Sequence, residues 1–138
     1  MEPKHQKLGF GFMRLPQKDG QVDLEQTKEM VDLFLARGFR YFDVARPYLE
    51  GKAEGYLRQC LTSRYPRDRY ILTDKLSGNC FKTQEDIRPL ALQQLRDCGV
   101  EYFDIYLMHS QCRENYDHYR KCRAYETAFQ LKEEGFVK

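Results

Sequence analysis

The sequence lacks several features that would point to particular classes of protein. No apolar stretch in its 138 residues is long enough to cross a bilayer. The first seven residues carry no apolar core, so we expect no secretory signal there. An excess of one charge is also missing, because 23 basic residues stand against 21 acidic ones, a formal net charge of +2. Neither a nucleic acid nor a membrane is therefore indicated as a partner.

The cysteines lack the spacing of a metal site or a disulfide framework. There are five of them, an odd number, and no Cys-x-x-Cys pair occurs among Cys60, Cys80, Cys98, Cys112 and Cys122. This pattern indicates reduced thiols, some of which would fill apolar faces as small hydrophobic residues. We therefore expect a cytoplasmic protein with no metal site.

Strand-like and helix-like segments alternate along the chain. No linker or repeat interrupts them, so we expect residues 1–138 to form a single domain. Period-two and continuous apolar runs predict strands at 8–15, 40–43, 70–73 and 104–108. Apolar stripes at helical spacing predict helices at about 23–38, 53–61, 83–99 and 116–134. Strict alternation is typical of an α/β fold with a parallel sheet and right-handed crossovers.

The third predicted helix contains an anomaly. Thr83 and Asp86 have the spacing of a capping box, which places the start of the helix at residue 83. Pro89 lies well inside it, where proline removes a helical hydrogen bond. We therefore expect the helix proper to begin nearer Arg88, or to kink.

Four polar residues lie at or just beyond the ends of predicted strands: Asp43, Tyr48, Lys75 and His109. Taken singly, each has an ordinary structural explanation, such as a turn aspartate, a packed tyrosine, a solvated lysine or a core histidine. In a barrel of parallel strands, however, the carboxyl ends of all strands face one mouth. The four side chains are then expected to converge there as a proton-donating site.

Four segments together resemble the aldo-keto reductase family. They are Leu8 to Pro16, Tyr41 to Ala45 followed by Tyr48, Gly51 and Glu54, Tyr70 to Lys75, and Tyr102 to His109. They occur in the family's order and at its spacings, nearly from end to end of the chain. The amino-acid sequences of these segments are most similar to those of the bacterial branch whose members often carry a ferredoxin-like C-terminal appendix.

The resemblance implies a (β/α)8 TIM barrel, of which residues 1–138 would form the first four β/α units, a half barrel. It implies NADPH-dependent reduction of small aldehydes or ketones to alcohols. Tyr48 would be the general acid, and the Lys75 ammonium would stabilise its phenolate. Asp43 would hold Lys75, and His109 would donate a hydrogen bond to the substrate oxygen.

The resemblance also implies where the cofactor would lie. Phe12, Met13 and Asp43 are the expected cofactor-adjacent residues. In relatives most of the grip on NADPH comes from the second half of the barrel, whereas this sequence reaches only 136–138, where the family's fifth strand begins. The chain would therefore be a truncated reductase. Substrate identity and the choice between NADPH and NADH are left open.

The chain departs from the family in two residue types and in the number of strands, and the number of strands supports an alternative. Val44 replaces the threonine usual after the aspartate, and Ala53 stands where serine often precedes Glu54. Four strands would form an open sheet whose inner face meets water and whose edges are unpaired. The alternative is a non-catalytic half-barrel remnant, stable only as an oligomer or with a partner that completes its sheet. A homodimer joined through the exposed edges is one form of it.

Overall fold

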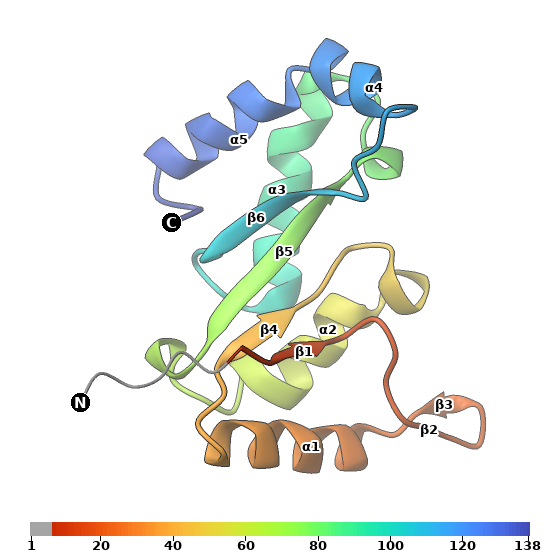
Figure 1. Cartoon of the computed structure of the whole chain (residues 1–138), viewed down its shortest axis with the longest axis vertical. Coiled ribbons are helices and arrows are strands. Elements are labelled where there is room, and N and C mark those ends of the chain that lie inside the picture. The colour runs from red at the N-terminus through yellow and green to blue at the C-terminus, as the bar shows by residue number, and fades with distance from the viewer. Residues whose placement is uncertain (1–6) are drawn as a thin grey trace.

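A sheet of four parallel strands forms the centre of the molecule (Figure 1). The computed structural model describes residues 7–138. Its strands pair in the order of the chain: β1 (Gly9–Gly11), β4 (Tyr41–Asp43), β5 (Ile71–Ser77) and β6 (Ile105–His109). A helical segment joins each strand to the next, so the predicted α/β fold with a parallel sheet is confirmed.

The helices cover one side of this sheet (Figure 1). Helices α2 and α3 lie behind the strands in this view, while α1 and α5 flank the two ends of the sheet. Their bounds are α1 Leu24–Ala36, α2 Ala53–Leu57, α3 Gln84–Cys98, α4 Tyr116–Lys121 and α5 Ala124–Glu133. Within residues 7–138, no helix is long and apolar enough to cross a membrane.

The core lies between the sheet and the helices. Strand residues alternate between two faces, so Phe42 points outward into the helices while its neighbours Tyr41 and Asp43 point the other way. The Phe42 ring is fully buried and packs edge-on against Phe34 of α1 and Tyr70 before β5. Burying a side chain of this size stabilises the fold by about 1.5–3 kcal/mol.

The other face of the sheet, here called the inner face, stays partly open to solvent. Parallel register aligns its side chains in rows, such as Asp43 with Thr73 and Lys75 with Leu107. Leu107 remains 41% exposed and Ile71 remains 38% exposed, although both are strand residues. Large apolar side chains at this exposure on adjacent strands mark a surface that lacks a covering layer.

The first predicted strand is shorter than expected. Pairing stops at Gly11, and the chain continues into a small hairpin, β2 (Gln17–Lys18) and β3 (Gln21–Val22). Its turn consists of Asp19 and Gly20, both with positive φ (53° and 75°). Asp-Gly is a preferred pair for such two-residue turns. The predicted strand over 8–15 is therefore present but shorter, because residues 12–15 leave the sheet after Gly11 and lead into the hairpin.

The third helix begins where its capping box lies, not near Arg88. Thr83 and Asp86 form the reciprocal cap, and α3 runs from Gln84 through Pro89 to Cys98. Pro89 is exposed, so the carbonyl that loses its partner can turn to water. The expectation of a start near Arg88 was therefore wrong.

The fourth predicted helix is divided into two. Arg123 adopts a left-handed backbone (φ 49°), which ends the run of α4 and starts α5 in a new direction. The break allows both Tyr119 and Ala124 to be completely buried. No glycine or proline marks the site, which explains why the sequence pattern predicted one continuous helix over 116–134.

Tyr119 of α4 ties the ends of two strands together. Its hydroxyl lies 3.0 Å from the Leu76 carbonyl oxygen of β5 and 2.8 Å from the His109 carbonyl oxygen of β6. The ring also fills the space beside Gly78, where an added Cβ would approach it to 3.1 Å. Tyr119 thus fixes the spacing of β5 and β6 at the rim of the sheet.

Substituting Tyr119 with phenylalanine should destabilise the fold by about 1–3 kcal/mol, because two strand carbonyls lose their buried donor. Urea unfolding followed by circular dichroism measures this loss. The matched control is Tyr116→Phe, at a half-exposed position, for which the change should stay within about 0.5 kcal/mol. Equal effects of the two substitutions would contradict the role given to the Tyr119 hydroxyl.

Residues beyond α5 return to the sheet. Val137 forms an isolated parallel bridge with Phe103, and the Lys138 amide donates to the Phe103 carbonyl oxygen at 3.0 Å. The Phe103 amide in turn donates to Phe136 at 3.0 Å. Residues 136–138 therefore lie along the outer edge of the sheet, beside the residues that lead into β6.

Candidate active site

An ion pair inside the rim joins two neighbouring strands. Lys75 Nζ lies 2.6 Å from Asp43 Oδ1 and donates a second hydrogen bond to the Val44 carbonyl oxygen at 3.0 Å. The Lys75 residue is only 8% exposed, while the Asp43 side chain is 27% exposed. A buried ammonium requires partners of this kind. The ion pair therefore compensates the charge of the ammonium and limits its movement.

The tyrosine and histidine meet above this pair. Tyr48 Oη lies 3.4 Å from His109 Nε2, and the two rings stand edge to face with centroids 5.4 Å apart. Lys75 Nζ lies 4.8 Å from the centroid of the Tyr48 ring. The four residues expected to converge at the mouth, Asp43, Tyr48, Lys75 and His109, are thus brought together.

Parallel register explains this convergence. Lys75 and Ser77 lie two residues apart on β5 and share the inner face with His109, which pairs directly with Ser77. Tyr48 reaches the same spot from the turn after β4, a 3₁₀ segment at Tyr48–Gly51. Leu49 and Glu50 in this turn have positive φ values of 51° and 57°. A left-handed backbone at two non-glycine residues stores strain, a frequent property of functional loops.

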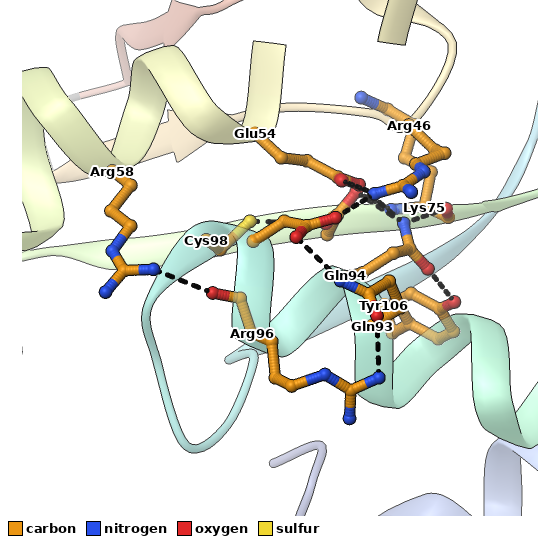
Figure 2. Close-up of polar contacts among 11 residues, drawn as sticks. Arg46, Glu54, Arg58, Lys75, Gln93, Gln94, Arg96, Cys98 and Tyr106 are labelled. Carbon is orange, nitrogen blue, oxygen red and sulfur yellow. Dashed lines mark hydrogen bonds and ion pairs between the residues drawn. The ribbon is translucent and has the colours of Figure 1, made fainter. Parts of the chain in front are cut away.

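Arg46 anchors the loop that carries Tyr48. Its guanidinium contacts Glu54 Oε2 of α2 at 2.5 Å and also pairs with Asp97 Oδ2 of α3 (Figure 2). Glu54 is almost fully buried, so the pair lies partly outside bulk solvent. Contacts with two helices fix the loop between β4 and the Tyr48 turn.

A buried polar network supports Lys75 from the opposite face of β5 (Figure 2). The Gln94 side-chain amide of α3 lies 3.0 Å from the Lys75 carbonyl oxygen, and 3.1 Å from both Asp74 Oδ1 and Glu54 Oε1. Tyr106 donates its hydroxyl proton to Gln94 Oε1 at 2.5 Å. Asp74 points into this network and does not compete with Asp43 for the ammonium, because neighbouring residues of a strand point to opposite faces.

Burial raises the pKa of both carboxyls in the network. For Asp74 burial comes first and the nearby charge of Glu54 adds to it, so its pKa lies well above the usual range. Burial also raises the pKa of Glu54, against the opposing effect of the Arg46 contact. At His109 burial comes first and the Lys75 charge second, and both lower its pKa. A neutral imidazole therefore stands beside Tyr48 near neutral pH.

The raised pKa of Asp74 predicts a pH-dependent stability. Above about pH 4 the unfolded carboxyl has lost its proton while the native one still holds it, so the native state binds more protons. The free energy of unfolding should then fall as pH rises, by roughly 1 kcal/mol per pH unit until the native carboxyl also ionises. Substituting Asp74 with asparagine should remove this slope.

Urea unfolding at a series of pH values measures the effect. The quantity to compare is the difference between the wild-type and Asp74→Asn curves, in which the contributions of carboxyls that do not interact with Asp74 cancel. Parallel curves for the two proteins would show that the native Asp74 carboxyl has no raised pKa.

The three residues expected near a cofactor fall into different environments. The Phe12 side chain is completely buried and packs against Phe10 and Phe42, so it offers no surface to a ligand. Met13 is 49% exposed. It follows Phe12, whose amide donates to the Asp43 carbonyl oxygen at 2.8 Å, so Met13 stands at the rim beside Asp43.

A cleft of about 530 Å³ opens beside His109. Its walls include Pro47 from the Tyr48 loop, Ser77 at the end of β5, and Glu114 and His118 from the segment after β6. The cleft thus reaches His109 from the side of α4. It has room for a small molecule beside this histidine.

Sequence reasoning missed the residues that support the site. Ser77 lies beyond the strand predicted at 70–73, although it is the last residue of β5 and its Oγ lies 2.6 Å from His109 Nδ1. Gln94 and Tyr119 lie within the helices predicted at 83–99 and 116–134, with no motif around them. A signal for Gln94 did exist, because it lies three residues after Ala91 and seven after Ile87, on the buried stripe of α3.

These features define a parallel β/α half barrel with a tyrosine, lysine, aspartate and histidine at the carboxyl ends of its strands. The sequence profile of the Aldo/keto reductase family matches residues 7–138. The chain belongs to this family.

Curated relatives agree with this assignment. An NAD(P)H-dependent D-xylose reductase of Pachysolen tannophilus is 34% identical over 88 residues, which is 62% of this chain and 27% of the relative. A 4-dihydromethyl-trisporate dehydrogenase of Mucor mucedo is 34% identical over 106 residues, 73% of this chain and 30% of the relative. The chain thus matches less than a third of the length of these relatives.

Solved structures show the same fold. An aldo-keto reductase of Bacillus halodurans in its holo form aligns with a TM-score of 0.73 and 27% identity, over 95% of this chain and 43% of that one. An aldo-keto reductase of Klebsiella pneumoniae in complex with NADPH aligns with a TM-score of 0.74 and 21% identity, over 94% and 42%. The expected architecture, the N-terminal part of a TIM barrel, is thereby confirmed.

Proposed function

We propose that this chain carries the proton-donating site of an NADPH-dependent reductase of small aldehydes or ketones. The observation that carries this proposal is the meeting of Tyr48, Lys75, Asp43 and His109 at one rim of the sheet. Family membership and relatives that are NAD(P)H-dependent support it.

The geometry suits protonation of a carbonyl oxygen. An oxygen held between the Tyr48 hydroxyl and His109 Nε2 would accept hydrogen bonds from both. As the carbonyl carbon gains a hydride, the oxygen takes the Tyr48 proton and the product leaves as an alcohol. The resulting phenolate is stabilised by the Lys75 ammonium, 4.8 Å from the ring centroid. Asp43 keeps that ammonium in place.

The residues present fit the reacting end of a nicotinamide cofactor. When bound, NADPH supplies the hydride, and a donor set of phenol, ammonium and neutral imidazole is the counterpart that such a reduction requires. Met13 and Asp43 border the rim on the side of β1 and β4 and would lie nearest to the cofactor. Phe12 could contribute only through its backbone, because its side chain is buried.

The direct test mixes the protein with NADPH and a panel of small aldehydes and ketones. Consumption of NADPH, followed by its absorbance and matched by alcohol formation, is expected. Binding is measured separately by the change in NADPH fluorescence. Cofactor binding without turnover on any carbonyl would contradict the catalytic part of the proposal.

The inner face favours a second candidate, a non-catalytic half barrel completed by a partner or by a second copy of the chain. Ile71 on β5 and Leu107 on β6 are exposed there at 38% and 41%, on neighbouring strands of an uncovered sheet face. Burial of this face would stabilise an assembly by removing apolar area from water. Sedimentation velocity distinguishes the cases, because a stable monomer that binds NADPH would contradict this candidate.

A further inference from the structure

Ser77 lies directly beside the histidine of the candidate site. It is the last residue of β5, pairs with His109 in the parallel register, and is only 2% exposed. Its Oγ lies 2.6 Å from His109 Nδ1. This distance is typical of a short hydrogen bond. The opposite ring nitrogen, Nε2, faces Tyr48 Oη at 3.4 Å.

The direction of the Ser77 hydrogen bond follows from the number of acceptors. A serine hydroxyl has one proton to donate, and a neutral imidazole has one nitrogen that donates and one that accepts. Within residues 7–138, His109 is the single side-chain or backbone partner of Ser77 Oγ. If Nδ1 were the donor, the hydroxyl proton would be left buried without an acceptor, which costs about 1–3 kcal/mol. Ser77 therefore donates, and Nδ1 accepts.

The ring then carries its single proton on Nε2. Burial and the Lys75 charge lower the pKa of His109 and so favour the neutral ring. With Nδ1 occupied by the serine proton, Nε2–H points toward Tyr48 Oη. In the opposite tautomer Nε2 would accept the Tyr48 proton and hold it away from a substrate.

We propose that Ser77 is a positioning residue whose hydroxyl holds His109 in the Nε2–H tautomer, so that His109 donates a hydrogen bond to the oxygen held at Tyr48. The catalytic meaning of this inference depends on the proposed reductase function. The tautomer itself is a property of the folded chain and can be measured without turnover.

The surrounding structure makes this contact rigid. The Tyr119 hydroxyl holds the carbonyl of His109 and that of Leu76, the residue before Ser77, at 2.8 and 3.0 Å. The ends of β5 and β6 therefore cannot slide past each other without breaking these hydrogen bonds. The distance between Ser77 Oγ and His109 Nδ1 is thus set by two strands and α4 rather than by side-chain rotation alone.

The test is nitrogen NMR of the histidine ring in the folded, isotopically labelled protein. The expected wild-type spectrum shows Nε2 protonated and Nδ1 unprotonated with the shift of a hydrogen-bond acceptor. In Ser77→Ala the Nδ1 resonance should lose that shift, and Ser77→Thr, which keeps the hydroxyl, should restore it. A wild-type ring protonated at Nδ1, or an Nδ1 resonance unchanged in Ser77→Ala, would overturn the proposal.

Kinetics supply an independent measurement. Ser77→Ala should lower kcat about tenfold with little change in KM, which corresponds to the loss of one modest hydrogen bond. Ser77→Thr should retain most of the rate. Should Ser77→Ala fail to fold, the wild-type spectrum alone decides the tautomer. An Nε2–H ring in a protein that turns over no carbonyl would leave this inference standing and count against the reductase function.

Discussion

Replacing Tyr48 with phenylalanine is expected to lower kcat for aldehyde reduction by about 10²–10⁴-fold, the usual contribution of a positioned general acid. The substitution removes only the hydroxyl that faces His109 Nε2. The ring remains over the Lys75 ammonium, so the contact between them survives. Cofactor and substrate binding should therefore change little while the chemical step slows.

Steady-state kinetics with NADPH and one good aldehyde measure this effect. Tyr56→Phe is the matched control, because Tyr56 lies on α2 and lines a different cleft, near the β2–β3 hairpin. It should reduce aldehydes at the wild-type rate. A Tyr48→Phe protein with kcat within threefold of wild type would assign the proton to another donor, and His109 would then be the group to examine.

Replacing Gln94 with leucine should destabilise the fold by about 3–5 kcal/mol, because more than one buried polar group is left unpaired at about 1–3 kcal/mol each. Gln94 is completely buried and donates to both Asp74 and Glu54, while it accepts the Tyr106 hydroxyl. Leucine has nearly the same size and can satisfy none of these groups. The loss should therefore arise from unpaired polar atoms rather than from a cavity.

Chemical denaturation gives the change in unfolding free energy. Gln93→Leu is the control, since the neighbouring Gln93 is only partly buried and its side chain bonds Asp97 at 2.7 Å. Its cost should stay near 1 kcal/mol or below. If Gln94→Leu were as mild as the control, the network behind Lys75 would contribute little to the fold.

The sequence predicted where the four candidate catalytic residues lie better than it predicted the residues that hold them in place. Asp43, Lys75 and His109 could be placed together because parallel strands share one direction, so their carboxyl ends meet at one rim. Tyr48 could be added through the family motif, although its loop geometry depends on the strained turn at Leu49 and Glu50. These inferences needed only strand direction and order.

Two of the supporting residues, Ser77 and Tyr119, could not be predicted because they depend on packing between distant segments. Serine is common in turns, and Ser77 is followed by Gly78, so the local sequence favours a turn. Only the pairing of β5 with β6 extends the strand to include Ser77. Tyr119 acts on β5 and β6 only because the chain turns at Arg123, a left-handed position without a glycine to signal it. Secondary-structure propensities describe one segment of the chain at a time, whereas these contacts join three segments.

The bridge between Phe103 and Val137 bears on how the sheet could grow. Backbone groups at the start of β6 are already satisfied by residues 136–138, so an incoming foreign strand finds fewer free donors and acceptors there. At the opposite edge, β1 offers three residues, two of them glycine. A strand this short and rich in glycine is a poor template for fibre growth. Strand addition is thereby discouraged at β1 and just before β6, and the partly open inner face, with Ile71 and Leu107 exposed, is left as another surface for contact.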